Sequence, residues 1–185
     1  MSTDFTYRIR RAADADAGRL RTMQERSLRA LGRSFYAADL IDRFIRQVGT
    51  MDAKVLAEGH YFLAVDTSGA VVASGGWSRL QPGYVGPGET AGSAAAEPTV
   101  RAVYVDPDHA RRGLGSAIMR QVEADAVAAG IRMLHLAATL SGIGLYERLG
   151  YARGRRRSLV LPDGTPFPVV EMHKRQSASA PVRAA

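Results

Sequence analysis

One stretch constrains this chain more than any other: residues 103–130, VYVDPDHARRGLGSAIMRQVEADAVAAG. An apolar run ends at Asp-Pro, two arginines and two closely spaced glycines follow, and an alanine-rich segment then ends at Gly130. This order predicts a strand, a tight loop and a long helix that begins at Gly113. We therefore expect at least one α/β unit, with a loop at the end of its strand that is a candidate binding site.

The loop has the composition of a phosphate site. A helix N-terminus exposes unpaired N–H groups and the positive end of a dipole, and glycine lets backbone amides approach an anion closely. Arg111 and Arg112 add positive charge, and Ser116 adds a hydroxyl in the first turn. A tight turn with solvated arginines explains the same residues equally well. Two known nucleotide motifs are excluded, because position 118 is Ile118 and no Gly-Lys-Ser/Thr occurs.

The remaining periodicity predicts a single α/β domain with a mixed sheet. We expect strands at 5–10, 61–65, 70–77, 100–105 and 131–138, helices at about 20–31, 37–48, 51–57, 113–129 and 141–149, and a closing hairpin around 162–164. Residues 81–98, rich in Gly, Pro and Ala, are expected to form a long mobile loop. We place the domain at 1–175 and a disordered tail at 176–185.

Composition narrows the class of protein. The absence of cysteine excludes disulfides, thiol nucleophiles and cysteine-ligated metals. No apolar run approaches a membrane span, and the first residues lack a signal-peptide core, so we expect a cytoplasmic protein without membrane partners. The 25 Lys and Arg against 18 Asp and Glu give a net charge of +7, which suits an anionic partner.

Two motifs together resemble the GNAT family of acetyl-CoA-dependent N-acetyltransferases. The family's phosphate loop, Gln/Arg-x-x-Gly-x-Gly/Ala, is similar to ARRGLG at 110–115, and its later Tyr-Glu-x-Leu-Gly-Phe/Tyr signature is similar to YERLGY at 146–151. The resemblance implies the acyl-CoA N-acyltransferase fold, a mostly antiparallel twisted sheet flanked by helices. It also implies direct attack of an amine on acetyl-CoA, which serves as cosubstrate, with no metal.

The resemblance implies roles for particular residues. Tyr146 is the implied catalytic acid, because a phenol is protonated at pH 7 and can protonate the leaving thiolate; a core aromatic is the simpler alternative. The implied coenzyme contacts are Val103, Tyr104, Val105, Arg111, Arg112, Gly113, Leu114, Gly115, Ser116 and Ser141. Those implied for the acceptor pocket are Ser34, Phe35, Tyr36 and Trp77, which packing explains equally well.

Three positions depart from the family pattern. Ala110 replaces the first Gln or Arg of the loop, and Ser141 stands where Asn is frequent, so both affect coenzyme affinity. Thr99 stands where a glutamate base is frequent, which leaves the general base unassigned. Its candidates are Glu58, His60, Glu97, His109 and His135.

Two other functions stay open. The departures allow an acyl-CoA-binding sensor without turnover. The net charge allows a nucleic-acid-binding module, although no helix-turn-helix pattern, zinc spacing or aromatic-interleaved basic strand supports it. For the enzyme, we expect a small-molecule or peptide amine as substrate, and a homodimer is allowed.

Overall fold

The computed structural model describes residues 6–80 and 97–176. These residues form a seven-stranded sheet in the order β1-β2-β3-β4-β5-β7-β6. The strands are β1 (Tyr7–Arg11), β2 (Tyr61–Asp66), β3 (Val71–Ser78), β4 (Thr99–Val105), β5 (Met133–Thr139), β6 (Ala152–Val160) and β7 (Pro166–Arg175). The helices are α1 (Ala17–Gly32), α2 (Ala38–Gln47), α3 (Ala53–Ala57), α4 (Leu114–Ala128) and α5 (Ile143–Arg148), with the short turns η1 (Asp14–Asp16) and η2 (Pro107–His109).

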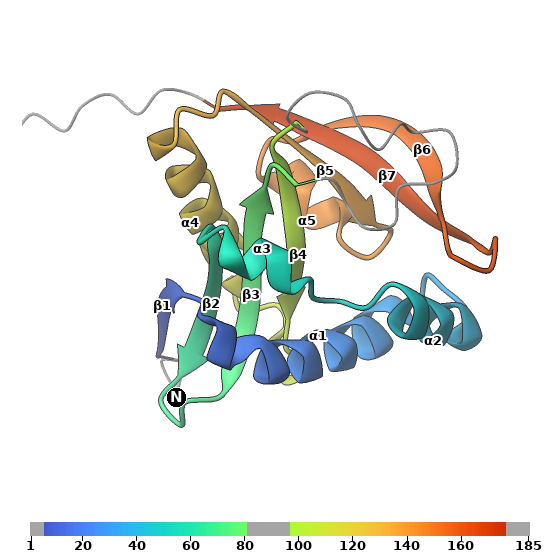
Figure 1. Ribbon diagram of the computed structural model, residues 1–185, viewed down its shortest axis with the longest axis horizontal. Coiled ribbons are helices and arrows are strands. Elements are labelled where there is room, and N and C mark those ends of the chain that lie inside the picture. The colour runs from blue at the N-terminus through green and yellow to red at the C-terminus, as the bar shows by residue number, and fades with distance from the viewer. Residues whose placement is uncertain (1–5, 81–96, 177–185) are drawn as a thin grey trace, which may run out of the picture.

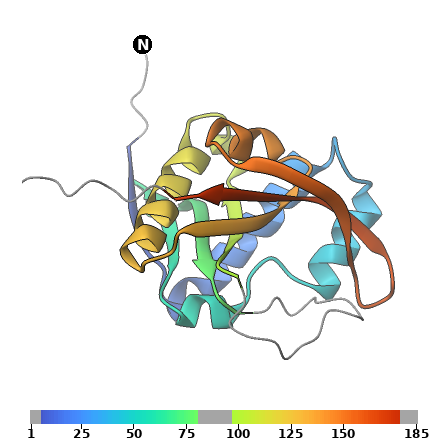
Figure 2. The same ribbon diagram turned by 90° about the horizontal axis from the view of Figure 1, so that it is seen from above.

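Helices cover both faces of the sheet (Figure 1). Alternation along β2 shows this directly: Phe62 and Ala64 pack in the cluster with α4 and α5, whereas Tyr61, Leu63 and Val65 pack against α1 and α3. Successive strand residues point to opposite faces, so a strand covered on both faces is buried along most of its length. A third cluster joins α2 to the β6–β7 hairpin, which extends towards that helix (Figure 2).

The predicted fold class is confirmed, since all sheet pairs are antiparallel except β4 with β5. The closing hairpin is longer than predicted, because β6 begins at Ala152. The start of this strand was missed in the sequence because it is rich in arginine. On this edge strand the arginines lie exposed and pair with acids, as Arg153 does with Glu147 and Arg155 with Glu171. Most of the expected loop at 81–98 and of the expected tail lies outside the described residues.

The two neighbours of β5 pair with it very differently. β7 runs antiparallel to it over seven residue pairs, from Met133–Arg175 to Thr139–Val169. β4 runs parallel and meets it in register at one pair, Thr99–His135, in the described strands. The two parallel strands therefore start together and then diverge, and the sheet has a gap that opens towards the C-terminal end of β4.

Candidate active site

At the edge of β4 that faces the gap, some backbone N–H and C=O groups point away from the neighbouring strand β3. Asp106 donates its N–H to Val72 of β3, and Tyr104 lies in register with Ser74. Hydrogen-bonding direction alternates along a strand, so the backbone groups of Val103 and Val105 point away from β3 and towards β5. There β4 and β5 have already separated. The arrangement presents amide donors and acceptors to an extended ligand lying in the gap.

The glycine loop lies directly beyond the open end of the gap. After η2, Arg111 and Gly113 have positive φ values of 65° and 79°, and Gly113 is the N-cap of α4. Left-handed residues next to right-handed ones turn successive backbone N–H groups to one side and form a concavity that can hold an anion. Arg111 and Arg112 are both exposed beside it. The loop and the start of α4 lie where the sequence predicted them, and their role in binding phosphate stays a prediction.

The two glycines of the loop have different roles. Gly113 is exposed, and a Cβ there would meet no atom within 4 Å, so its positive φ is what favours glycine. Gly115 is buried, and a Cβ there would lie 3.1 Å from Cδ2 of Leu145 on α5. The second glycine therefore serves the close packing of α4 against α5, which brings the helix with Tyr146 to the loop.

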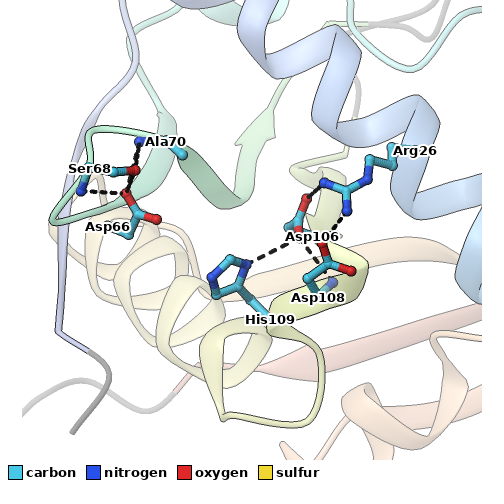
Figure 3. Close-up of polar contacts among 7 residues, drawn as sticks. All are labelled: Arg26, Asp66, Ser68, Ala70, Asp106, Asp108 and His109. Carbon is cyan, nitrogen blue, oxygen red and sulfur yellow. Dashed lines mark hydrogen bonds and ion pairs between the residues drawn. The ribbon is translucent and has the colours of Figure 1, made fainter. Parts of the chain in front are cut away.

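A group of ion pairs, here called the ionic clamp, joins the loop to α1, and no motif predicts it beyond the Asp-Pro stop. Buried Asp106 accepts hydrogen bonds from the Asp108 N–H (3.0 Å) and from Nη1 of Arg26 (2.7 Å), and it lies 3.1 Å from Nδ1 of His109. Arg26 also contacts the Asp108 carboxylate (Figure 3). Because Arg26 belongs to α1, the clamp fixes η2, and with it the start of the loop, against the opposite helical layer.

Tyr146 lies on α5, nearly buried at 8% exposure, with its ring edge-on to Tyr151 at 5.7 Å between centroids. Burial raises the pKa of Tyr146 above its usual value, so the phenol stays protonated at neutral pH. Among the residues that the structure describes, none makes a hydrogen bond with its hydroxyl. The group is available as a donor to a substrate atom.

The structure separates the residues expected in the acceptor pocket. Ser34 and Phe35 are exposed in the α1–α2 connection, and Phe35 is 51% exposed. Tyr36 is buried, and its hydroxyl donates to the Pro168 C=O and accepts from the Leu140 N–H. Burial raises the pKa of Tyr36 to about 12, so it stays an uncharged core residue.

Trp77 lies elsewhere. It is 2% exposed in the cluster under α4, and its indole N–H donates to Asp125 at 2.8 Å. His60 stacks on this indole with 4.1 Å between ring centroids and shares the same carboxylate at 2.7 Å. Trp77 is therefore on the α4 face of the sheet, while Ser34 and Phe35 belong to the α1–α2 layer.

Of the candidate bases, two histidines contact aspartates whose side chains are only 8% exposed: His60 contacts Asp125, and His109 contacts Asp106. Glu58 accepts a hydrogen bond from the Ser78 hydroxyl.

Glu97 and His135 lie together, with 3.6 Å between Oε2 and Nδ1, at the closed end of the gap where β4 and β5 pair. Ser141, at the other end of β5, has its hydroxyl 3.2 Å from that of Thr139.

The part of the chain described by the structure contains no group of three or more acidic or histidine side chains placed to hold a metal ion. None of its helices has the length and apolarity to cross a bilayer.

A family model for the acetyltransferase (GNAT) family matches residues 24–151, which is more than half of the chain and includes the gap, the loop and α5. The chain belongs to the GNAT acetyltransferase family. It is thus a member of a transferase family that uses acetyl-CoA. No curated protein matches it.

Solved structures support the fold of this GNAT protein. A GCN5-related N-acetyltransferase from Rhodopseudomonas palustris is similar with a TM-score of 0.71 and 19% identity, over 92% of this chain and 96% of the other. The PaiA N-acetyltransferase of Thermoplasma acidophilum, solved in complex with coenzyme A, gives 0.67 and 13% over 92% and 99%. YncA of Salmonella typhimurium, a putative acetyltransferase solved with acetyl-CoA, gives 0.62 and 16% over 97% and 99%.

Proposed function

We propose that this GNAT protein is an N-acetyltransferase that transfers the acetyl group of acetyl-CoA to a primary amine. The observation that carries the proposal is the gap between β4 and β5, which opens onto a glycine loop at the N-terminus of α4. A long flexible thioester with a phosphorylated end fits this shape: the amide-rich arm in the gap, the phosphates at the loop.

The loop and the strand bind the coenzyme. The N–H groups at the start of α4, with Arg111 and Arg112, hold phosphate oxygens through charge-assisted hydrogen bonds. Leu114 and Ser116 belong to the same first turn. The backbones of Val103 and Val105 pair with the arm in the gap as a neighbouring strand would, with Tyr104 between them on β4. Ser141, beyond β5, completes the coenzyme contacts.

The reaction needs two proton transfers. The amine nitrogen bonds to the thioester carbon, the carbon–sulfur bond breaks, the nitrogen loses a proton and the sulfur gains one. An amine with a pKa near 10.4 costs roughly 4.6 kcal/mol to deprotonate at pH 7. Glu97 and His135, at the closed end of the gap, are the pair best placed to accept that proton.

Tyr146 supplies the proton to the sulfur. Its phenol is held protonated by burial, and its hydroxyl has no competing partner among the described residues. A thiolate with a pKa near 8.5 needs only modest help, so a positioned donor contributes about a hundredfold. The exposed Ser34 and Phe35 are the acceptor-pocket residues that remain available for contact with the amine.

The test combines binding with turnover. Isothermal titration with coenzyme A is expected to show saturable binding, and a panel of small-molecule and peptide amines incubated with acetyl-CoA is expected to release free thiol with at least one member. Binding without turnover on any amine would favour a sensor. Binding of duplex DNA without binding of coenzyme A would reject the proposal.

A further inference from the structure

The gap raises a question of stability. β4 and β5 are already paired at Thr99 and His135, and two parallel strands that start in register gain hydrogen bonds by continuing. Backbone donors and acceptors left unpaired inside a sheet cost free energy. Some feature of the chain must therefore oppose the closing of β4 onto β5 when no ligand is present.

That feature is a bulge in β4. The register between β3 and β4 shifts between Ser74 and Gly76, opposite residues 101–104, and Ala102 has a φ of 46°. A positive φ is unfavourable for alanine and persists only where its surroundings enforce it. The strand is also approached very closely here, since a Cβ on Gly75 would lie 2.9 Å from Cγ2 of Val103.

A buried hydrogen-bond network holds this residue. The hydroxyl of Tyr61, on β2, lies 2.5 Å from the Ala102 C=O. A phenol has one hydrogen and a carbonyl can only accept, so that hydrogen goes to Ala102. Gln24, on α1, donates from Nε2 to the Tyr61 oxygen at 2.9 Å and to the Ser74 oxygen at 3.2 Å. Tyr61 is 1% exposed and Gln24 is fully buried.

Gly76 makes room for this contact. A Cβ on Gly76 would lie 2.5 Å from Cδ2 of Tyr61 and 2.5 Å from the His60 oxygen. The Tyr61 ring can therefore cross β3 only because position 76 has no side chain. Burial raises the pKa of Tyr61 well above its usual value. Ala102 and Tyr104, both on β4, pack against the same buried cluster as Tyr61.

We propose that Tyr61 is a positioning residue that holds Ala102 in its left-handed conformation and so keeps the β4–β5 gap open for the coenzyme. The inference rests on the proposed function for the identity of the ligand. The effect of Tyr61 on the conformation of β4 does not depend on that function. Without the hydroxyl, Ala102 relaxes to an extended conformation, β4 straightens, and Val103 and Val105 pair with β5.

The experiment uses Tyr61→Phe, which keeps the ring and removes only the hydroxyl. Coenzyme A should bind it about tenfold more weakly than the parent in isothermal titration. Amide hydrogen exchange at Val103 and Val105 in the free protein should slow, because those amides gain partners. Ile41→Val is the control, since it removes one methylene from the separate cluster under α2. It should lower the melting temperature while coenzyme affinity stays within twofold.

A second substitution tests the cause. Glycine adopts positive φ without strain, so Ala102→Gly no longer needs the hydrogen bond. In the Tyr61→Phe background it should restore coenzyme affinity to within about threefold of the parent. If Tyr61 only stabilises the core, Ala102→Gly should add its own loss and restore nothing.

Unchanged affinity and unchanged exchange in folded Tyr61→Phe would overturn the inference. So would weaker binding without slower exchange, because the hydroxyl would then act on the coenzyme directly. If Tyr61→Phe does not fold, Ser74→Ala replaces it, with about threefold weaker binding and the same rescue expected, and unchanged binding counting against the inference. If the parent itself fails to bind coenzyme A, the proposed function is wrong, and the exchange measurement still decides the role of Tyr61.

Discussion

β5 has a closed junction with β7 and an open junction with β4, and the two differ in how far the backbones pair. Along β7 it pairs over seven residues, and the side chains of both strands, such as Leu136 and Met172, join one buried cluster. Along β4 it pairs at one residue, because β4 bulges at Ala102. Backbone pairing runs along the whole of β5 at the closed junction, whereas at the open one the proposed function assigns the unpaired edge to the coenzyme. Substitutions at the two junctions should therefore have different consequences.

The largest effect is expected at Tyr146, which lies beside the open junction. Tyr146→Phe keeps the ring packing and removes the proton donor, so turnover should fall by about ten- to a thousandfold while coenzyme affinity stays nearly constant. Steady-state kinetics with an amine found in the panel would measure the turnover number, and titration would measure the affinity.

Tyr151→Phe is the matched control, because it removes a hydroxyl from the ring that meets Tyr146 edge-on. It should retain turnover within about threefold. Near-parental turnover in a folded Tyr146→Phe protein would mean that Tyr146 is a packing residue and that water protonates the thiolate.

The next effect concerns the loop at the mouth of the open junction. A β-branched residue is strongly disfavoured at positive φ, so Gly113→Val should distort the start of α4 and obstruct the phosphates. Coenzyme affinity should fall by about ten- to a hundredfold. Gly130→Val is a close control at the other end of the same helix, with the same φ of 79° and the same open surroundings. It should lose stability but keep its affinity, and equal losses of affinity in both variants would remove the loop from the site.

The contrast between the junctions also separates what sequence could predict from what it could not. The loop at 110–115 and the helix after it follow from local signals, namely glycine, charge and helical period, and both were confirmed as structure. The gap depends on a hydrogen bond between residues 41 positions apart, Tyr61 and Ala102. No spacing rule encodes such a contact.

The same reasoning applies to single residues. Trp77 in GGWSRL resembled a pocket residue, but strand alternation places it on the α4 face, and the face of a strand depends on a register that the sequence left undetermined. The start of β6 was not predicted because it is rich in arginine, and an edge strand tolerates charged side chains on both faces. Local features such as the glycine loop could therefore be predicted from the sequence, whereas the pairing and facing of distant strands could not.

A smaller effect is expected from the two loop arginines. Arg111→Gln with Arg112→Gln removes two charges beside the phosphates, so the Michaelis constant for acetyl-CoA should rise about tenfold, and less at high salt. The constant for the amine should stay within twofold. The control is the double variant Arg132→Gln with Arg175→Gln. It removes the same charge from exposed residues where β5 begins and β7 ends, at the far end of the gap. An unchanged coenzyme constant in the loop variant would reassign Arg111 and Arg112 to the solvated surface.

The smallest effect on binding is expected far from both junctions, where β1 passes into η1. Arg10 donates two hydrogen bonds of 2.7 Å to Asp16, which also accepts from the Ala13 N–H. The hydrogen bonds from Arg10 hold the pKa of Asp16 at about 2, against the opposing effect of burial. Asp16→Asn should therefore lower the free energy of unfolding at pH 7 by about 1–2 kcal/mol, discounted because Arg10 is partly solvated.

The pH dependence fixes the cause of that loss. A depressed carboxyl pKa stabilises the folded state fully above the unfolded pKa near 4, and this contribution disappears as the pH falls from about 4 towards 2. Urea unfolding should thus show a difference between parent and Asp16→Asn at pH 7 that shrinks by pH 2.5. Asp14→Asn, in the same turn but exposed, should change stability by less than about 0.5 kcal/mol. Both variants should bind coenzyme A within twofold of the parent, because the β1 edge stabilises the sheet without touching the open junction; a tenfold loss in Asp16→Asn would show that the gap depends on the far edge as well.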